Sequence, residues 1–113
     1  MMGSCLDLEV LEELVDIMGD DMEMLLNAYF SDSKTKLEEL MQMDIQTEQE
    51  KIFRMAHALK GSSRNVGVVG FSNVCENIEK LARANNLTER EFDLENLTQL
   101  YNQAIEELKQ RYL

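Results

Sequence analysis

The sequence predicts an all-α protein: an antiparallel up-down four-helix bundle with a short additional N-terminal helix packed across one end. Three observations favour this fold class. The 113-residue chain has no proline and only five glycines, and it is rich in residues that form helices well, including eight methionines. Apolar residues recur at spacings of three and four along most of the chain. The stretches between these amphipathic segments are short, which is typical of antiparallel neighbours in one bundle.

The first two expected helices follow one another closely. Asp7 can cap a short helix, because an aspartate side chain accepts hydrogen bonds from the free backbone N–H groups at a helix start. Gly19 fits the end of this helix, since glycine readily adopts the left-handed conformation found there. Asp20 can cap the second helix, whose apolar pattern continues to Met41.

The third helix carries the residues of greatest chemical interest. Thr47 and Glu50 have the spacing of a capping box, in which two side chains accept hydrogen bonds from backbone N–H groups at a helix start. We expect Gly67 and Gly70 to close this helix.

Two more helices complete the bundle. The fourth ends at the asparagine pair 85–86, and the fifth begins near Thr88 or Asp93 and runs almost to the C-terminus. No repeat or linker interrupts the pattern. We therefore expect residues 1–113 to form a single domain, with residues 1–6 flexible.

Composition and charge exclude several classes of function. The net charge of −11 argues against binding to nucleic acid, because that contact depends on cations that neutralise phosphates. No apolar run approaches the roughly 20 residues that a membrane span needs, so we expect a cytoplasmic protein with no membrane partner. Cys5, Cys75 and one histidine are too few ligands for a zinc site. We therefore expect no bound metal. The two cysteines allow one disulfide, but two reduced thiols are favoured in a cytoplasmic protein.

Positive charge is concentrated in one segment of this acidic chain. Residues 51–75 contain four basic side chains and no acidic one, whereas the remaining seven basic residues share the rest of the chain with all 22 acidic ones. The four are Lys51, Arg54, Lys60 and Arg64. One interpretation is a solvated helix face on which charges cluster by chance. The other is a site for an anion.

His57 lies in the middle of this basic segment. At about 100° per residue, it points roughly 160° away from Leu59 and 100° away from Ala56, both of which belong to the apolar stripe of the third helix. The imidazole should therefore face solvent. Its own face of the helix carries Phe53, Arg54, Lys60, Gly61 and Arg64.

Gly61 is unusual because glycine inside a helix costs about 1 kcal/mol relative to alanine. Lying one turn after His57, it would leave the imidazole open to the approach of a bulky partner. Close packing against another helix is the alternative explanation. The outward position of Gly61 favours access.

These residues suit the transfer of a phosphoryl group. A neutral imidazole is a good nucleophile near neutral pH. The cations Arg54, Lys60 and Arg64 would stabilise the charge on the phosphoryl oxygens during and after transfer. No glycine-rich phosphate loop and no recognisable catalytic triad accompanies the histidine.

Residues 56–67 read Ala-His-Ala-Leu-Lys-Gly-Ser-Ser-Arg-Asn-Val-Gly. This segment resembles the signature of histidine-containing phosphotransfer (HPt) domains, the intermediate carriers of multistep two-component phosphorelays. The resemblance implies that His57 is phosphorylated, that Lys60 contacts the phosphoryl oxygens and that Gly61 provides clearance. A role for Arg64 is inferred from its position alone.

The resemblance also implies what the chain does and with which partners. It would be a stand-alone phosphocarrier without kinase activity, taking a phosphoryl group from the aspartyl phosphate of one receiver domain and passing it to another. The receivers would be those of a hybrid sensor kinase and a response regulator. The Mg²⁺ needed for transfer would be held by the receiver, so no cofactor is expected here, and the carrier should be a monomer.

The resemblance further implies an apolar docking patch beside the histidine, on the first three helices. The candidates for this patch are Leu11, Val15, Met18, Met22 and Phe53. Flexible methionine side chains suit a surface that fits more than one partner.

Two other functions remain open from the sequence. One is the phosphoacceptor and dimerisation domain of a sensor kinase, in which the histidine is usually followed by Glu and then by Pro. Here Ala58 follows His57, and the chain has no proline. The other is a non-catalytic helical bundle that binds a partner, with His57 incidental.

Overall fold

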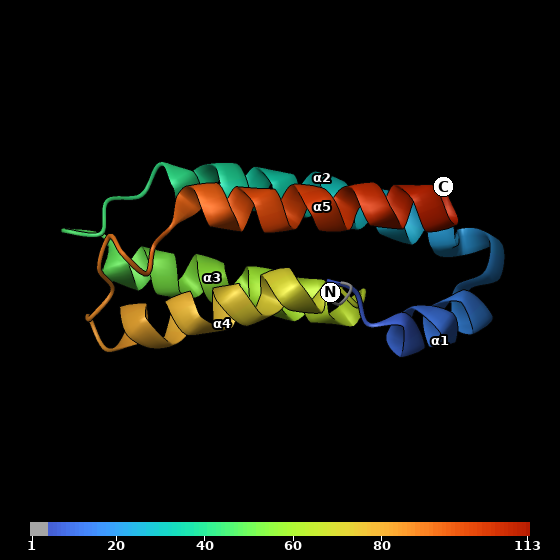
Figure 1. Cartoon of the computed structure of the whole chain (residues 1–113), viewed down its shortest axis with the longest axis horizontal. Coiled ribbons are helices and arrows are strands. Elements are labelled where there is room, and N and C mark those ends of the chain that lie inside the picture. The colour runs from blue at the N-terminus through green and yellow to red at the C-terminus, as the bar shows by residue number, and fades with distance from the viewer. Residues whose placement is uncertain (1–4) are drawn as a thin grey trace.

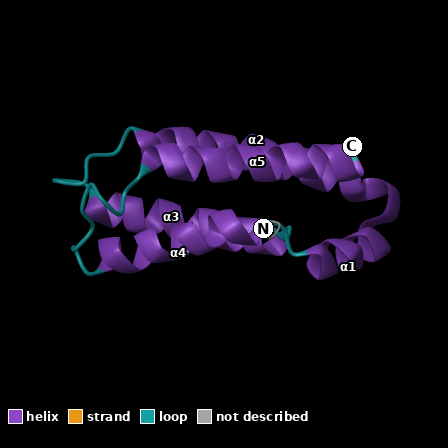
Figure 2. Ribbon diagram, in the orientation of Figure 1, coloured by secondary structure: helices purple, strands orange, loops and turns teal. Residues whose placement is uncertain are grey.

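The computed structural model describes residues 5–113, and its regular elements are helices. The elements are α1 (Leu8–Met18), the 3₁₀ turn η1 (Gly19–Asp21), α2 (Met22–Met41), α3 (Gln49–Asn65), α4 (Val69–Arg83) and α5 (Leu94–Tyr112). Figure 2 shows that loops join these helices. Among the described residues, β-type pairing is limited to an isolated antiparallel bridge between Leu6 and Val68. The predicted all-α class is confirmed.

The four long helices form an elongated bundle of two helix pairs (Figure 1). α2 lies beside α5, and α3 lies beside α4, with α2 also packed on α3 and α4 on α5. The molecule measures 44 × 29 × 19 Å along its principal axes. α1 lies at one end of the bundle, beyond the ends of α3 and α4 in Figure 1. The pair α3–α4 makes the most extensive contact in the molecule, and this pair carries the site described below.

The N-terminal segment is tied to the loop between α3 and α4. Asp7 caps α1 as predicted, because its Oδ1 accepts hydrogen bonds from the N–H groups of Glu9 at 3.1 Å and Val10 at 3.3 Å. The prediction that residues 1–6 are flexible is wrong for Leu6, whose side chain is 6% exposed and packs into the core. Residues 1–4 lie outside the described part of the chain. Leu6 precedes the first helix, so the helical spacing of apolar residues could not predict that its side chain is buried.

The passage from α1 to α2 differs in one detail from the prediction. Gly19 ends α1 with φ +52°, as expected of a glycine at a helix end. Asp20 does not cap α2, because it lies inside the 3₁₀ turn and α2 begins at Met22. Asp21 precedes that helix and makes no side-chain cap bond. The 3₁₀ turn runs directly into α2, so few free backbone N–H groups remain there for a side chain to cap.

The expected capping box at the start of α3 is not formed. The helix begins at Gln49, and Glu48, rather than Thr47, is the residue before it. Oε1 of Glu48 accepts a hydrogen bond from the backbone N–H of Asp44 at 2.9 Å, and the N–H of Thr47 donates to the carbonyl of Asp44 at 3.2 Å. The loop 44–48 thus closes on itself before the helix starts.

The end of α3 depends on Gly67. Its φ of +76° is a left-handed conformation, and a Cβ there would lie 2.9 Å from the carbonyl oxygen of Asp7. The N–H of Val68 donates to the carbonyl of Ser63 at 2.8 Å and that of Gly67 to Arg64 at 3.1 Å, which is a Schellman ending. Gly70 does not close α3, contrary to prediction, since it lies in the first turn of α4.

The last two helices begin and end close to the predicted positions. α4 ends just before Asn85, which has a φ of +58°. Of the two alternatives for the start of α5, Asp93 is the cap, because its side chain accepts a hydrogen bond from the N–H of Asn96 at 3.1 Å. Within residues 5–113, no helix has both the length and the apolar character that crossing a membrane requires.

Two pairs of hydroxyl groups lie inside the largely apolar core. The hydroxyls of Tyr29 on α2 and Ser63 on α3 are 2.7 Å apart, and those of Ser33 on α2 and Tyr101 on α5 are 2.6 Å apart. Burial raises the pKa of Tyr29 and, to a smaller degree, that of Tyr101, so both phenols stay neutral. Each buried hydroxyl has a partner, as a low-dielectric interior requires.

Candidate functional site

His57 projects from the middle of α3 into solvent. Its side chain is 61% exposed, whereas Ala56 and Leu59 are fully buried, so the predicted outward orientation is confirmed. A Cβ on Gly61, one turn later, would meet nothing within 4 Å outside its own helix backbone. Close helix packing therefore does not explain this glycine. The surface beside the imidazole is open.

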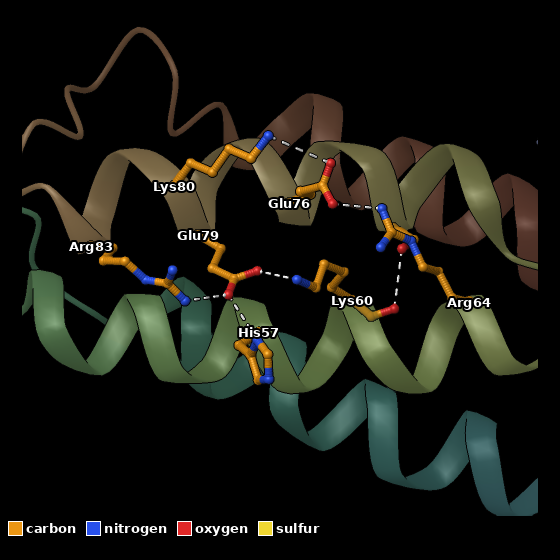
Figure 3. A network of polar contacts seen from close by, with 8 residues as sticks. His57, Lys60, Arg64, Glu76, Glu79, Lys80 and Arg83 are labelled. Atoms are coloured by element: carbon orange, nitrogen blue, oxygen red, sulfur yellow. Dashed lines mark hydrogen bonds and ion pairs between the residues drawn. The ribbon is translucent and has the colours of Figure 1, made fainter.

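A carboxylate from the neighbouring helix holds the imidazole. Oε2 of Glu79 on α4 lies 2.7 Å from Nδ1 of His57, and Oε1 lies 2.6 Å from Nζ of Lys60. Nη2 of Arg83, one turn further along α4, donates to Oε2 at 3.1 Å. Figure 3 shows these three side chains converging on Glu79 from both helices. The Glu79 side chain is only 5% exposed, so three groups share one buried acceptor.

Glu79 remains ionised in this position. Its burial alone would raise the pKa, but the hydrogen bonds and positive charges of Lys60 and His57 outweigh that effect and lower the pKa of Glu79 below its ordinary value. A buried carboxylate is stable only when paired in this way. Glu79 is therefore an anion that organises the site.

The hydrogen bond to Glu79 decides which nitrogen of His57 is reactive. An ionised carboxylate can only accept, so Nδ1 of the imidazole carries the hydrogen. The second ring nitrogen, Nε2, points away from Glu79 (Figure 3). In the neutral ring Nε2 then holds the lone pair, and it is the nitrogen available to an incoming electrophile.

The predicted cations lie near His57, but each is paired with a glutamate. Lys60 contacts Glu79 and is largely covered. Arg54 donates to Glu50 at 2.9 Å on its own helix, and Arg64 donates to Glu76 of α4 at 2.7 Å. The glutamate partners of Lys60 and Arg64 are Glu79 and Glu76 of α4, which follow the basic segment 51–75 in the sequence. The surface around His57 is therefore a mixed ionic network rather than the purely basic strip that the sequence predicted.

Sequence reasoning missed Glu79 and Arg83. A signal for Glu79 was present, because it interrupts the apolar stripe of α4 between the buried residues Cys75 and Ala82. A charged residue at such a position needs a partner. Arg83 follows it at the i+4 spacing of a helical ion pair, and its guanidinium carbon lies 4.7 Å from the centre of the Phe53 ring.

The predicted docking patch is partly wrong. Leu11 and Met22 are buried in the core, where Leu11 packs against the turn at Gly67, so neither is available to a partner. Val15 is exposed, and Met18 and Phe53 are half-buried.

Two exposed apolar residues were missed. Ile17 is 77% exposed and Met24 is 66% exposed. Around α1, apolar residues occupy both the inner and the outer side of the helix, which is why the sequence pattern does not separate them.

No cluster of three potential metal-binding side chains of His, Cys, Asp or Glu occurs among residues 5–113. Cys75 is fully buried and Cys5 is half-buried, and both are free thiols. At His57 the structure presents an exposed imidazole with charged neighbours.

A helical bundle that presents one exposed, carboxylate-bound histidine on its surface is built as a carrier, since its reactive atom is open to another macromolecule. The family model of the Hpt domain matches residues 9–111, and the chain belongs to this family. The solved structure of histidine-containing phosphotransfer protein B (HptB) from Pseudomonas aeruginosa PAO1 is similar to it. The two share 26% sequence identity and a TM-score of 0.86, over 99% of this chain and 100% of that one.

A comparison with curated proteins found no match. The family nevertheless establishes the general function: histidine phosphotransfer in two-component signalling, by a phosphocarrier that is not a kinase. At this level the prediction from the motif at residues 56–67 is confirmed.

Proposed function

We propose that this protein accepts a phosphoryl group on His57 from the aspartyl phosphate of one receiver domain and passes it to the aspartate of another. The donor receiver would belong to a hybrid sensor kinase and the acceptor to a response regulator. The observation that carries the proposal is the hydrogen bond between Nδ1 of His57 and Glu79, which leaves Nε2 as the exposed nucleophile.

The transfer step balances with the groups present in the two proteins. Nε2 of neutral His57 attacks the phosphorus of the aspartyl phosphate, an N–P bond forms and the P–O bond to the aspartate breaks. The aspartate leaves as a carboxylate. The phosphorylated ring gains a positive charge and keeps its Nδ1 hydrogen, which it donates to Glu79. The ionised carboxylate stabilises that positive charge, and the reverse sequence returns the group to the next receiver.

The neighbouring residues have supporting roles in this proposal. Lys60 lies close enough to His57 to share Glu79 with it, and its ammonium can turn towards phosphoryl oxygens. Gly61 leaves room for the receiver. Arg54 and Arg64 contribute positive charge to the surrounding surface from their ion pairs. The receiver supplies Mg²⁺, and no cofactor is assigned to this chain.

We further propose that receivers dock on the apolar surface of α1 and the first turn of α2, together with Phe53 beside His57. Val15, Met18, Ile17 and Met24 provide the exposed or half-exposed apolar side chains of this surface. Interfaces that form and dissociate repeatedly are small, and a surface of this extent suits such exchange. The carrier is proposed to act as a monomer. The net charge of −11 supports protein rather than nucleic-acid partners.

The test is transfer of labelled phosphate from a phosphorylated receiver in the presence of Mg²⁺. Wild-type protein should be labelled on His57, in a bond that acid hydrolyses and base preserves, and His57→Gln should stay unlabelled. Label on Ser62 or Ser63 instead would contradict the proposal. So would a His57→Gln variant that retains the full signalling effect, because it would indicate a protein that only binds.

A further inference from the structure

Arg83 has an unusual position at the edge of the site. Its guanidinium donates to Oε2 of Glu79, the same oxygen that accepts from Nδ1 of His57. The guanidinium also lies against the ring of Phe53, which is one turn before His57 on α3. Lys60, by contrast, contacts the other oxygen of Glu79. Arg83 is thus the cation that shares an acceptor atom with the reactive ring.

The contacts that hold Arg83 are weak enough to be exchanged for contacts with another anion. Its side chain is 64% exposed, and exposed ion pairs and cation–π contacts are weak. Glu79 carries one negative charge and faces Lys60, Arg83 and the His57 ring, so positive charge exceeds negative charge here before any phosphoryl group arrives. A phosphoryl group brings a charge of about −1.5 to −2 and three acceptor oxygens, and the planar guanidinium matches such oxygens in pairs.

We propose that Arg83 is a phosphoryl-binding residue that Glu79 holds in place until His57 is phosphorylated. When the phosphoryl group forms on Nε2, the guanidinium leaves Oε2 of Glu79 and binds the phosphoryl oxygens, with the Phe53 ring supporting the movement. Glu79 keeps its bond to Nδ1 of His57. This inference rests on the proposed function, because it requires phosphorylation of His57.

The other arginines on this surface do not share this arrangement. Arg64 is instead paired with Glu76, whose other oxygen is 3.9 Å from Nζ of Lys80. Arg54 is paired with Glu50 on its own helix. The variants Arg64→Ala and Arg54→Ala serve as matched controls, because each of them removes one arginine and one ion pair close to His57.

The experiment compares Arg83→Ala and Arg83→Lys with Arg64→Ala and Arg54→Ala, each phosphorylated on His57 by a labelled receiver. The ³¹P resonance of the phosphohistidine is followed through a pH titration, because a cation bound to the phosphoryl oxygens favours loss of a proton from the phosphorylated side chain. Arg83→Ala should move the titration midpoint to higher pH, and Arg83→Lys should retain part of the wild-type value. The two controls remove only surrounding positive charge, so they should move the midpoint clearly less than Arg83→Ala does. Arg83→Ala should also slow transfer about tenfold, as expected for one charge-assisted contact in a partly exposed site.

The outcomes separate this inference from the proposed function. Wild-type protein that is never labelled on His57 would refute the proposed function. Normal labelling of His57, with Arg83→Ala titrating and transferring as the Arg64→Ala control does, would overturn only the role of Arg83. Circular dichroism confirms that each variant is folded, and a midpoint shift in a folded Arg83→Ala protein is not explained by a purely structural role.

Discussion

Nδ1 of His57 and Oε2 of Glu79 lie 2.7 Å apart, so the reactive ring of α3 is held by a carboxylate of α4. This contact joins the two helices at the proposed site of phosphorylation. It fixes the tautomer of the ring, keeps Nε2 free and gives Lys60 and Arg83 a common partner. Substitution of Glu79 is therefore the most direct test of the site.

Glu79→Gln should slow phosphotransfer without unfolding the protein. The amide keeps the size of the side chain but lacks the charge that stabilises a cationic phosphorylated ring, and we expect a loss of about tenfold or more in rate. Transfer rates from a phosphorylated receiver measure the effect. Glu76→Gln, on the same helix and paired with Arg64, is the control and should transfer normally. Equal rates for the two variants would show that Glu79 has no part in the reaction.

The stability provided by Glu79 should depend on pH in a defined direction. The pKa of Glu79 is lowered in the folded protein, so its stabilisation is complete above the ordinary value of 4.5 and is lost as pH falls through the lowered pKa. Wild type should be more stable than Glu79→Gln by about 1–3 kcal/mol at pH 7, and this difference should shrink below pH 4.5. Urea denaturation over a pH series measures it. A difference that stays constant down to the acid limit would contradict the assigned pairing.

Gly61→Ala should make the protein more stable. A Cβ there meets nothing within 4 Å, so the substitution gains up to about 1 kcal/mol in helix propensity at no steric cost. A larger side chain, as in Gly61→Gln, should slow transfer by obstructing the receiver while thermal unfolding is little changed. Unimpaired transfer by Gly61→Gln would indicate that the receiver does not approach over this residue.

Gly67→Ala should have the opposite effect on stability. The residue has φ +76°, and the new Cβ would come within 2.9 Å of a backbone oxygen, which cannot move as a flexible side chain can. We expect a loss of about 1–3 kcal/mol in the free energy of unfolding. Gly61→Ala is the matched control, since it is the same substitution near the same helix end. Similar unfolding midpoints for the two variants would refute the assignment.

The Cys75 thiol should be unreactive in the folded protein. Burial raises its pKa to about 12, and the thiolate is the reactive form. In a Cys5→Ser background, a thiol reagent at pH 8 should label Cys75 only as fast as the protein unfolds, and denaturant should accelerate labelling sharply. Rapid labelling without denaturant would show that the core around Cys75 opens more readily than its burial indicates.

Local patterns in the sequence predicted local structure well. Spacing of apolar residues located the helices, and Asp7 was recognised as a cap. Asp93 was one of two positions given for the start of the fifth helix. The angle between His57 and Leu59 placed the imidazole on the outside. Each of these features depends on residues within about one or two turns of the same helix, where the geometry is fixed. The motif around His57 was recognisable for the same reason.

Contacts between helices could not be predicted in this way. The pairing of His57 with Glu79 depends on how far α4 is displaced along α3, and no pattern within either helix determines that displacement. The burial of Leu11 and Met22 likewise depends on how the N-terminal segment meets the end of the bundle. At Thr47 a capping pattern was present, but the turn closed by Asp44 and Glu48 took its place.

The hydroxyl pairs Tyr29–Ser63 and Ser33–Tyr101 restrict the whole scaffold. A shift of one residue along a helix axis is about 1.5 Å, enough to break bonds of this length, so α3 cannot slide against α2, nor α2 against α5, without stranding hydroxyls in an apolar interior. The imidazole of His57 therefore keeps a fixed position along the axis of the bundle. Under the proposed function, each receiver would therefore find Nε2 of His57 at the same position on the bundle.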